Sequence, residues 1–269
     1  MDLELVERRP DSDSGRPPVL MVHGLGHGSW CWEQWLDGVA AAGYPAYAVS
    51  LRGHAGSSGR LRTARLSHYV DDVVRTALEL PRPAVLVGHS MGGLVVQRAL
   101  ARYAARAGVL VAPVPAQPAV YAYLRLLRRH PGDALAMLAG RSLPMRPEYL
   151  FRELDAAGAA RHSERCGEES ALAQYQLIFH RPAPQPLGGA PVLVLESPDD
   201  ELLPASSIRA TARRYGAELV EFPGMGHDLM LDARWKQPLQ AVLDWLKDPP
   251  PPHHSQARGG TLQGGHPQA

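Results

Sequence analysis

The architecture of this chain can be inferred from one segment, which reads Pro83-Ala84-Val85-Leu86-Val87-Gly88-His89-Ser90-Met91-Gly92-Gly93-Leu94-Val95-Val96. It begins with a short apolar, β-branched run that is typical of a buried strand, and it ends with apolar residues at helical spacing. The pentapeptide between them has the form G-x-S-x-G. On a strand–turn–helix, this pattern predicts a sharp turn that presents Ser90 as a nucleophile, because small flanking residues let strand and helix approach closely. The alternative is a plain Gly-Ser turn.

A nucleophilic serine needs a base, a group that orients the base, and donors for the oxyanion. In this type of turn, the acid and then the histidine follow the serine along the chain. His227 fits as the base, because it stands in a glycine-rich loop, Phe222-Pro223-Gly224-Met225-Gly226-His227-Asp228, between a strand-like run and a terminal helix. A loop position would let its imidazole reach Ser90. The alternative is a loop histidine without a role.

The acid is expected after the apolar run 191–195, where the sequence continues Glu196-Ser197-Pro198-Asp199-Asp200-Glu201-Leu202-Leu203-Pro204. Its role would be to accept a hydrogen bond from the imidazole Nδ1–H and to stabilise the imidazolium. Three consecutive acidic residues are also typical of a solvated turn. Asp200 and Asp199 both fit the position. The strand expected at 108–111 offers no alternative, because Ala112-Pro113-Val114-Pro115 follows it without a carboxylate.

The oxyanion donors are expected to be backbone N–H groups. One is that of Met91, directly after the nucleophile, and the other comes from an earlier loop. The strand expected at 18–22 runs into His23-Gly24-Leu25-Gly26-His27-Gly28-Ser29, where Leu25 is the expected donor. A dinucleotide-binding loop is the alternative. It is disfavoured, because the glycines lack the G-x-G-x-x-G spacing and no acidic residue stands about 20 positions further on.

Taken together, these segments resemble the α/β-hydrolase superfamily, in particular its cap-bearing esterases, lipases and peroxidase-like members. The resemblance covers roughly residues 17–247, and its matching segments are His23-Gly24-Leu25-Gly26 with Trp30 and Trp32, Leu51-Arg52-Gly53-His54-Ala55-Gly56-Ser57-Ser58, Gly88-His89-Ser90-Met91-Gly92-Gly93, Asp199-Asp200-Glu201-Leu202-Leu203-Pro204 and Gly226-His227-Asp228. In this family an acid often stands four residues before a proline, which selects Asp200. The stretch Gly28-Ser29-Trp30-Cys31-Trp32 is also similar to the plant methylesterase and hydroxynitrile-lyase branch.

Two features depart from the family pattern. Before Pro17 only residues 3–7 read as a strand, where the family usually has a two-strand hairpin, so we expect the edge strand to be short or missing. Glu196-Ser197-Pro198 stands where many relatives carry a small residue and glycine, so we expect an altered turn before the acid. Ser90 excludes the nucleophilic aspartate of the epoxide hydrolases and haloalkane dehalogenases of this fold.

Strands and helices alternate along the chain, which predicts an α/β fold with a mostly parallel sheet covered on both faces. Helices are expected at 35–42 and 66–80, and a strand at 44–49. The resemblance implies a hydrolase core from 1–112 and 188–247. It also implies a helical cap at 113–187, inserted between the sixth and seventh strands of the fold. The tail 248–269 is rich in Pro, Gly, Gln and His, and is expected to be disordered.

The candidate substrate-binding residues are Trp30, His89, Tyr121 and Leu124. Apolar residues of the cap could line an acyl pocket or simply pack the cap against the core. Four histidines crowd the predicted site without ligand-like spacing, so neither a metal nor a cofactor is predicted; they are His23, His27, His54 and His89.

Composition sets further bounds. A 45% hydrophobic content suffices for a core, and 28 basic against 27 acidic residues give no reason to expect nucleic acid or an anionic membrane as a partner. Cys31 and Cys166 form neither a disulfide framework nor a metal pattern. No signal peptide is visible in Met1-Asp2-Leu3-Glu4, and no stretch reaches the ~20 apolar residues of a membrane helix. We therefore expect the cytoplasm as location.

The sequence predicts a serine hydrolase that cleaves a carboxylic ester, or a related small acyl compound, through Ser90, His227 and Asp200 and an acyl-enzyme. Two alternatives remain open. The same triad could run acyl transfer, perhydrolysis or carbon–carbon lyase chemistry, or the chain could be a ligand-binding receptor with a vestigial triad. Acyl length, alcohol group, stereochemistry and oligomeric state stay open.

Overall fold

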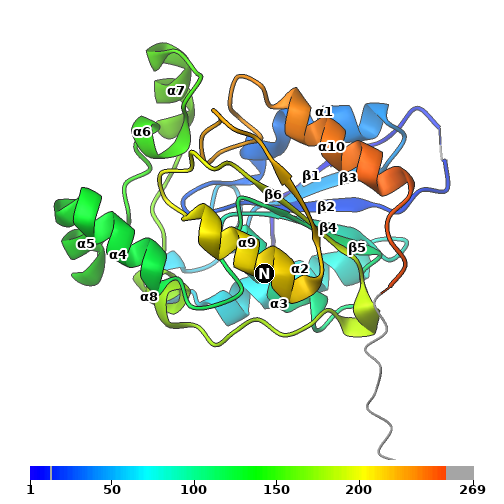
Figure 1. Cartoon of the computed structure of the whole chain (residues 1–269). Coiled ribbons are helices and arrows are strands. Elements are labelled where there is room, and N and C mark those ends of the chain that lie inside the picture. Colours follow the sequence, from blue (N-terminus) through cyan, green and yellow to red (C-terminus); the bar gives the residue numbers. More distant parts are fainter. Residues whose placement is uncertain (13, 253–269) are drawn as a thin grey trace, which may run out of the picture.

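The computed structural model describes residues 1–12 and 14–252. In this part of the chain, the strands form one sheet in the order β1-β3-β2-β4-β5-β6-β7 (Figure 1). Only β1 is antiparallel to its neighbour; the other adjacent strands pair in parallel. The strands are β1 (Leu5–Arg8), β2 (Val19–Val22), β3 (Ala46–Val49), β4 (Val85–His89), β5 (Ala107–Val111), β6 (Val192–Glu196) and β7 (Glu218–Glu221).

Both faces of the sheet are apolar, because alternate residues of each strand point to opposite sides. On β2, Val19 and Met21 pack into one core, and Leu20 and Val22 into the other. The first core is covered by α1 (Glu33–Ala41) and α10 (Lys236–Lys247). Three helices cover the second core: α2 (Leu66–Glu79), α3 (Met91–Leu100) and α9 (Ala205–Tyr215). The predicted doubly covered α/β sheet is confirmed, and Figure 1 shows α1 and α10 on the side opposite α2, α3 and α9.

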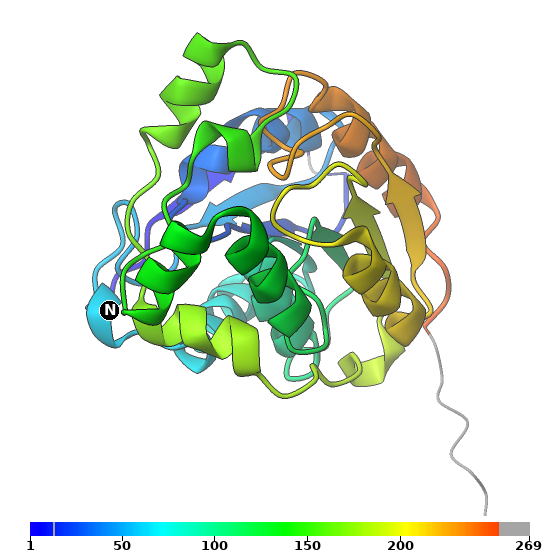
Figure 2. The ribbon, with the colours of Figure 1, turned by 60° about the vertical axis from the view of Figure 1, so that its left-hand side comes forward.

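Five helices lie between β5 and β6, and Figure 2 shows them in green to yellow-green on the side of the molecule that faces the viewer. They are α4 (Val120–Arg129), α5 (Pro131–Leu138), α6 (Pro147–Leu150), α7 (Ala156–Ser163) and α8 (Ala171–Phe179). Local sequence explains several of their starts. Proline occupies the first turn of α5 and α6, and the side chains of Asp155 and Ser170 cap α7 and α8.

Strands are counted differently in this chain, which affects how the position of the insert is described. It follows the fifth strand of this chain, not the sixth, because a single short strand, β1, precedes β2 in place of a two-strand hairpin. Short 3₁₀ turns occur at η1 (Ser29–Trp32), η2 (Leu61–Thr63) and η3 (Leu187–Gly189). None of the helices within the described residues has the length and apolar character needed to cross a membrane. Most of the predicted tail, 253–269, lies outside the described residues.

Candidate active site

Ser90 stands between β4 and α3 with φ +50° and ψ −118°. For a residue other than glycine, this conformation costs about 1–3 kcal/mol, so the surrounding structure must hold it in place. Its N–H donates to the carbonyl of Val111 (3.1 Å), and its carbonyl accepts from the N–H of Val114 (2.9 Å). The flanking glycines have no space for a side chain. A Cβ on Gly88 would lie 2.3 Å from the carbonyl oxygen of Gly92. The strand, turn and helix expected around Ser90 are thus present.

His227 and Asp200 meet although 27 residues separate them. Nδ1 of the imidazole lies 2.6 Å from Oδ2 of the carboxylate, and both side chains are buried. The other carboxylate oxygen accepts from the N–H groups of Leu202 (2.7 Å) and Leu203 (3.0 Å). Burial lowers the pKa of His227, but the Asp200 charge and hydrogen bond outweigh it and raise that pKa above its ordinary value.

The neighbouring carboxylate points elsewhere. Oδ2 of Asp199 accepts from the N–H of Gly224 at 2.7 Å, which ties the acid turn to the loop that carries His227. The structure therefore brings Asp200, and not Asp199, to the imidazole. Both carboxylates stand at the carboxyl end of β6, on the edge of the sheet where parallel strands place their loops together.

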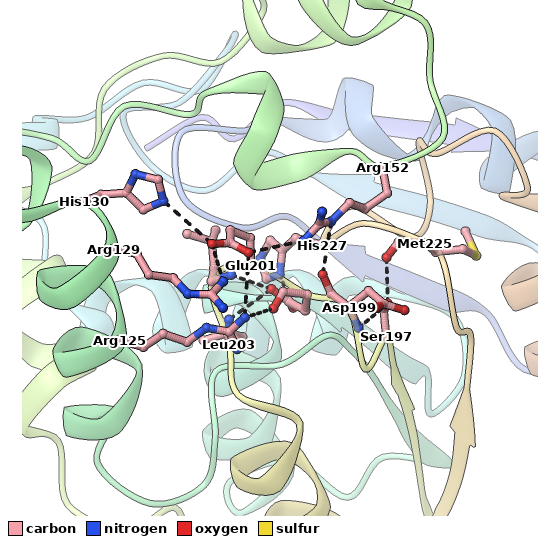
Figure 3. A network of polar contacts seen from close by, with 12 residues as sticks. Arg125, Arg129, His130, Arg152, Ser197, Asp199, Glu201, Leu203, Met225 and His227 are labelled. Atoms are coloured by element: carbon pink, nitrogen blue, oxygen red, sulfur yellow. Dashed lines mark hydrogen bonds and ion pairs between the residues drawn. The ribbon is translucent and has the colours of Figure 1, made fainter.

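Arginines from the inserted segment hold this acid turn (Figure 3). Arg129 and Arg152 donate to the Glu201 carboxylate at 2.5 Å and 3.2 Å. Arg125 donates to the backbone carbonyl of Asp200 at 2.8 Å. The backbone that carries Asp200 is therefore anchored to α4 and to the segment after α6. Nothing in the sequence indicated these contacts, because each arginine is 49 or more positions from the residue it contacts.

Among the described residues, no hydrogen bond joins Ser90 to His227. His89, the residue before Ser90, contacts His227: the two ring centroids lie 4.8 Å apart, and Nε2 of His89 lies 3.3 Å from the His227 carbonyl oxygen. Catalytic hydrogen bonds are often long in structures without substrate and tighten in its complex.

The loop after β2 lies directly against Ser90. A Cβ on Gly24 would stand 3.0 Å from Cβ of Ser90, so only glycine allows this approach. Within the described chain, neither Leu25 nor Met91 has a hydrogen-bond acceptor for its N–H. The Met91 N–H lacks an acceptor because Met91 stands in the first turn of α3, where N–H groups have no partner within the helix. Both expected donors therefore stand beside Ser90 with unused N–H groups.

A cavity of about 70 Å³ borders Ser90, and its remaining lining is largely apolar. Much of this lining comes from the inserted segment, through Leu126, Met137 and Ile178 of its helices and Leu143 of the loop after α5. Leu143 also borders a larger polar groove of about 850 Å³. A single side chain therefore stands at the boundary between the apolar cavity and an outer groove.

The structure does not bring the expected substrate-binding residues to this cavity. Tyr121 and Leu124 are 75% and 45% exposed and are not among its lining residues. Trp30 stacks on His27 with the ring centroids 5.3 Å apart, and the guanidinium of Arg165 lies over the Trp30 ring, 4.4 Å from its centroid. His89 is buried beneath the turn. The arginines of α4 gather on one side of the helix together with Tyr121, so helical spacing could have indicated that Leu126 faces inward and Tyr121 does not.

One buried acidic residue was missed by the sequence analysis. Asp228 lies 2.9 Å from Nε2 of His27 and 3.3 Å from Nε2 of His89. Together with His227, Asp228 and His89 also form a group whose possible metal-ligand atoms lie within 4.8 Å of one another. The adjacency of Asp228 to the catalytic candidate was visible in the sequence, but nothing there indicated which partners it would meet.

The comparisons with known proteins agree with this architecture. The sequence profile of the Alpha/beta hydrolase family matches residues 19–257. A monoacylglycerol lipase from Mycolicibacterium smegmatis is 28% identical over 258 residues, which is 88% of this chain and 90% of that protein. Esterase PIR7B from Oryza sativa subsp. japonica is 33% identical over 113 residues, 40% of this chain and 42% of that protein.

Among solved structures, the monoacylglycerol lipase of Paleococcus ferrophilus superimposes with a TM-score of 0.69 at 23% identity, covering 91% of this chain and 98% of that one. At this identity, the likeness shows the fold alone. The profile match covers most of the chain and includes the nucleophile turn, the acid turn and the histidine loop. The chain belongs to the α/β hydrolase family.

Proposed function

We propose that Ser90, His227 and Asp200 form a catalytic triad that hydrolyses a carboxylic ester through an acyl-enzyme. The coarser statement, that this member of the family is a carboxylic ester hydrolase, agrees with the lipase and esterase names of its relatives. One observation carries the finer proposal: His227 is held by Asp200 at 2.6 Å, at the same edge of the sheet as a serine in a strained turn beside an apolar cavity.

Each group has a defined step. Nε2 of His227 takes the proton of Ser90 Oγ as that oxygen attacks the ester carbonyl carbon, and Asp200 stabilises the resulting imidazolium. The N–H groups of Leu25 and Met91 donate to the oxyanion. The imidazolium then gives its proton to the departing alkoxide, which leaves as the alcohol. Water attacks the acyl-enzyme with His227 again as base, and this releases the acid and restores the serine.

The inserted helices are proposed to act as a cap over residues 1–112 and 188–247. Leu126, Met137, Leu143 and Ile178 would contact the acyl group in the apolar cavity. With about 70 Å³ available, short acyl groups fit as the structure stands, and longer ones require Leu143 or Met137 to move. The alcohol portion would face the polar groove beyond Leu143. A small-molecule ester with an apolar acyl group is the proposed substrate.

The test is hydrolysis of p-nitrophenyl esters from acetate to palmitate, and of monoacylglycerols from monobutyrin to monopalmitin, by the wild type and Ser90→Ala. We expect turnover that is lost in Ser90→Ala, and wild-type protein labelled by a fluorophosphonate at Ser90 only. Equal turnover in both proteins would exclude Ser90 as the nucleophile. Labelling without turnover of any ester would favour non-hydrolytic chemistry, and neither labelling nor turnover would favour a receptor.

A further inference from the structure

A second buried histidine–carboxylate pair lies beside the proposed triad. Nε2 of His27 is 2.9 Å from Oδ2 of Asp228, and the two side chains are 2% and 0% exposed. Nδ1 of the same imidazole lies 2.7 Å from the carbonyl oxygen of Leu25. A carbonyl and a carboxylate can only accept hydrogen bonds, so both ring nitrogens must donate. These contacts require His27 to be an imidazolium.

The electrostatics of the cluster agree with this protonation state. Burial lowers the pKa of His27, but the Asp228 charge and hydrogen bond outweigh it and raise that pKa well above its ordinary value. Burial raises the pKa of Asp228, yet the surrounding imidazoles, His27 foremost, bring it down to about 2. The third member, His89, has its pKa lowered to about 3, mainly by burial. The cluster therefore holds one positive and one negative charge in direct contact.

This ion pair connects the segments that carry the proposed catalytic groups. Asp228 directly follows His227 in the chain, and its N–H donates to the carbonyl of Leu150 at 3.0 Å. Its Oδ1 faces His89, the residue before the nucleophile, at 3.3 Å. His27 belongs to the loop that also carries Leu25. Asp228 thus joins the histidine loop to the oxyanion loop through His27, and to the nucleophile turn through His89.

The orientation of the Leu25 N–H depends on the peptide groups on either side of it. The carbonyl of Gly24, in the peptide that includes this N–H, lies 2.8 Å from Nδ1 of His23. Nε2 of His23 accepts from the N–H of Leu51 at 2.9 Å, so its Nδ1 carries the proton and donates. The following peptide is held through the Leu25 carbonyl by His27. Both peptides around Leu25 are therefore anchored, the second one by the ion pair.

We propose that His27 and Asp228 are a positioning pair, which holds the Leu25 N–H where the oxyanion forms and sets the His227 loop against it. This inference rests on the proposed function. The pair touches no reacting atom, so its loss leaves ester binding intact and weakens stabilisation of the tetrahedral state. A donor displaced by a fraction of an ångström costs rate, because a preorganised oxyanion site works by its geometry.

The variants His27→Gln, Asp228→Asn and their combination test this role. With p-nitrophenyl butyrate, we expect kcat to fall by about 10- to 100-fold in each while KM stays within about twofold. The inhibition constant of a trifluoromethyl ketone with the same acyl chain, whose hemiketal oxyanion occupies the oxyanion site, should rise in parallel. The kcat of the double variant should fall no further than that of the more strongly affected single variant, because both substitutions remove the same interaction.

His54 and Glu169 provide a matched control. Their side chains form a pair of the same kind, at 3.0 Å and 2% and 1% exposed, with further hydrogen bonds to Arg52 and Tyr69 in place of Leu25. Because Glu169 borders the outer groove, the control variant is His54→Gln, which should lower the melting temperature as much as the test variants do. In His54→Gln, any fall in kcat should not be accompanied by a matching rise in the inhibition constant. Asp228→Glu, which keeps the charge, should recover part of kcat.

The outcomes separate this inference from the proposed function. Folded variants with wild-type kcat and inhibition constant, or with a raised KM alone, would overturn the positioning role while the hydrolase stands. Absence of turnover in the wild type would instead remove the proposed function. Nitrogen-15 NMR of the histidines measures the protonation state of His27 without any ester substrate. Both nitrogens of His27, assigned with His27→Gln, should carry protons at pH 7.5, and a neutral ring would contradict the pair.

Discussion

Nδ1 of His227 lies 2.6 Å from Oδ2 of Asp200, across a buried contact between two loops that leave the same edge of the sheet. The carboxylate is fully engaged, because its second oxygen accepts two backbone N–H groups from the turn that follows it. This arrangement holds the imidazole with Nδ1 protonated and leaves Nε2 as the basic atom.

Asp200→Asn should therefore disable the base while the fold survives. The amide can present its N–H₂ to Nδ1 and so favour the wrong tautomer. We expect kcat to fall by about 10³- to 10⁴-fold. Asp199→Asn is the matched control, because its carbonyl oxygen can still accept from Gly224 and activity should change less than twofold. A strong effect of the control with full activity of Asp200→Asn would exchange the two roles.

The pH dependence of kcat/KM should reflect the protonation of His227. The base must be neutral, so activity is lost as pH falls through its pKa. That pKa is raised, against burial, by Asp200. The midpoint of the acid limb should therefore lie above pH 6.5, and it should move to lower pH in Asp200→Asn. A wild-type midpoint below pH 6.5, measured from pH 5 to 9, would contradict this assignment.

Backbone strain at the nucleophile should appear in stability. At φ +50°, glycine is relaxed and alanine is not, so Ser90→Gly should exceed Ser90→Ala in free energy of unfolding by about 1 kcal/mol. Glu33 is the control position: its backbone is helical, with φ −47°, so we expect the opposite order of stability for its glycine and alanine variants. There the glycine variant should be less stable than the alanine variant by about 0.5–1 kcal/mol. Urea denaturation measures both pairs, and equal stability of the Ser90 variants would argue against strain.

Acyl-chain preference should follow the cavity lining. Leu143→Ala and Met137→Ala remove side chains that border the space beside Ser90, so both should shift the best p-nitrophenyl ester to a longer chain. Leu138 adjoins Met137 in sequence but is 46% exposed, and Leu138→Ala should keep the wild-type preference. A shift in the control as large as in Met137→Ala would mean that the cavity does not select the acyl group.

A carboxylate away from the site should make stability depend on pH. Glu196 is buried at the end of β6, where burial and the adjacent Glu221 raise its pKa to about 7 despite Arg209 at 2.9 Å. The folded chain holds this proton more tightly than the unfolded one, so stability falls as pH rises from about 4.5 through 7. We expect this contribution to amount to about 1–3 kcal/mol. Glu196→Gln should flatten the profile in chemical denaturation, and an unchanged slope would contradict the assignment.

Local patterns were sufficient for the elements and for the nucleophile turn. A strand that ends at His89 and a helix that starts at Met91 follow from apolar spacing, and the glycines around Ser90 follow from sterics that act within a few residues. Alternation of such elements indicates a parallel sheet, and its carboxyl edge then gathers the serine, acid and histidine loops. A short edge strand before β2 was likewise expected, because only residues 3–7 read as a strand before Pro17.

Contacts between distant segments could not be predicted from local patterns. His27 and Asp228 are 201 positions apart, and neither carries any local mark of the other, so their ion pair exists only because the fold brings β2 and β7 loops to one edge. The same holds for the arginines on Glu201, and for the inward face of α5, whose apolar residues surround the helix too evenly to reveal its direction. Steric limits and periodicity depend on neighbouring residues, so they can be recognised in the sequence. Burial and the pairing of charges depend on contacts between distant segments, so only the tertiary structure decides them.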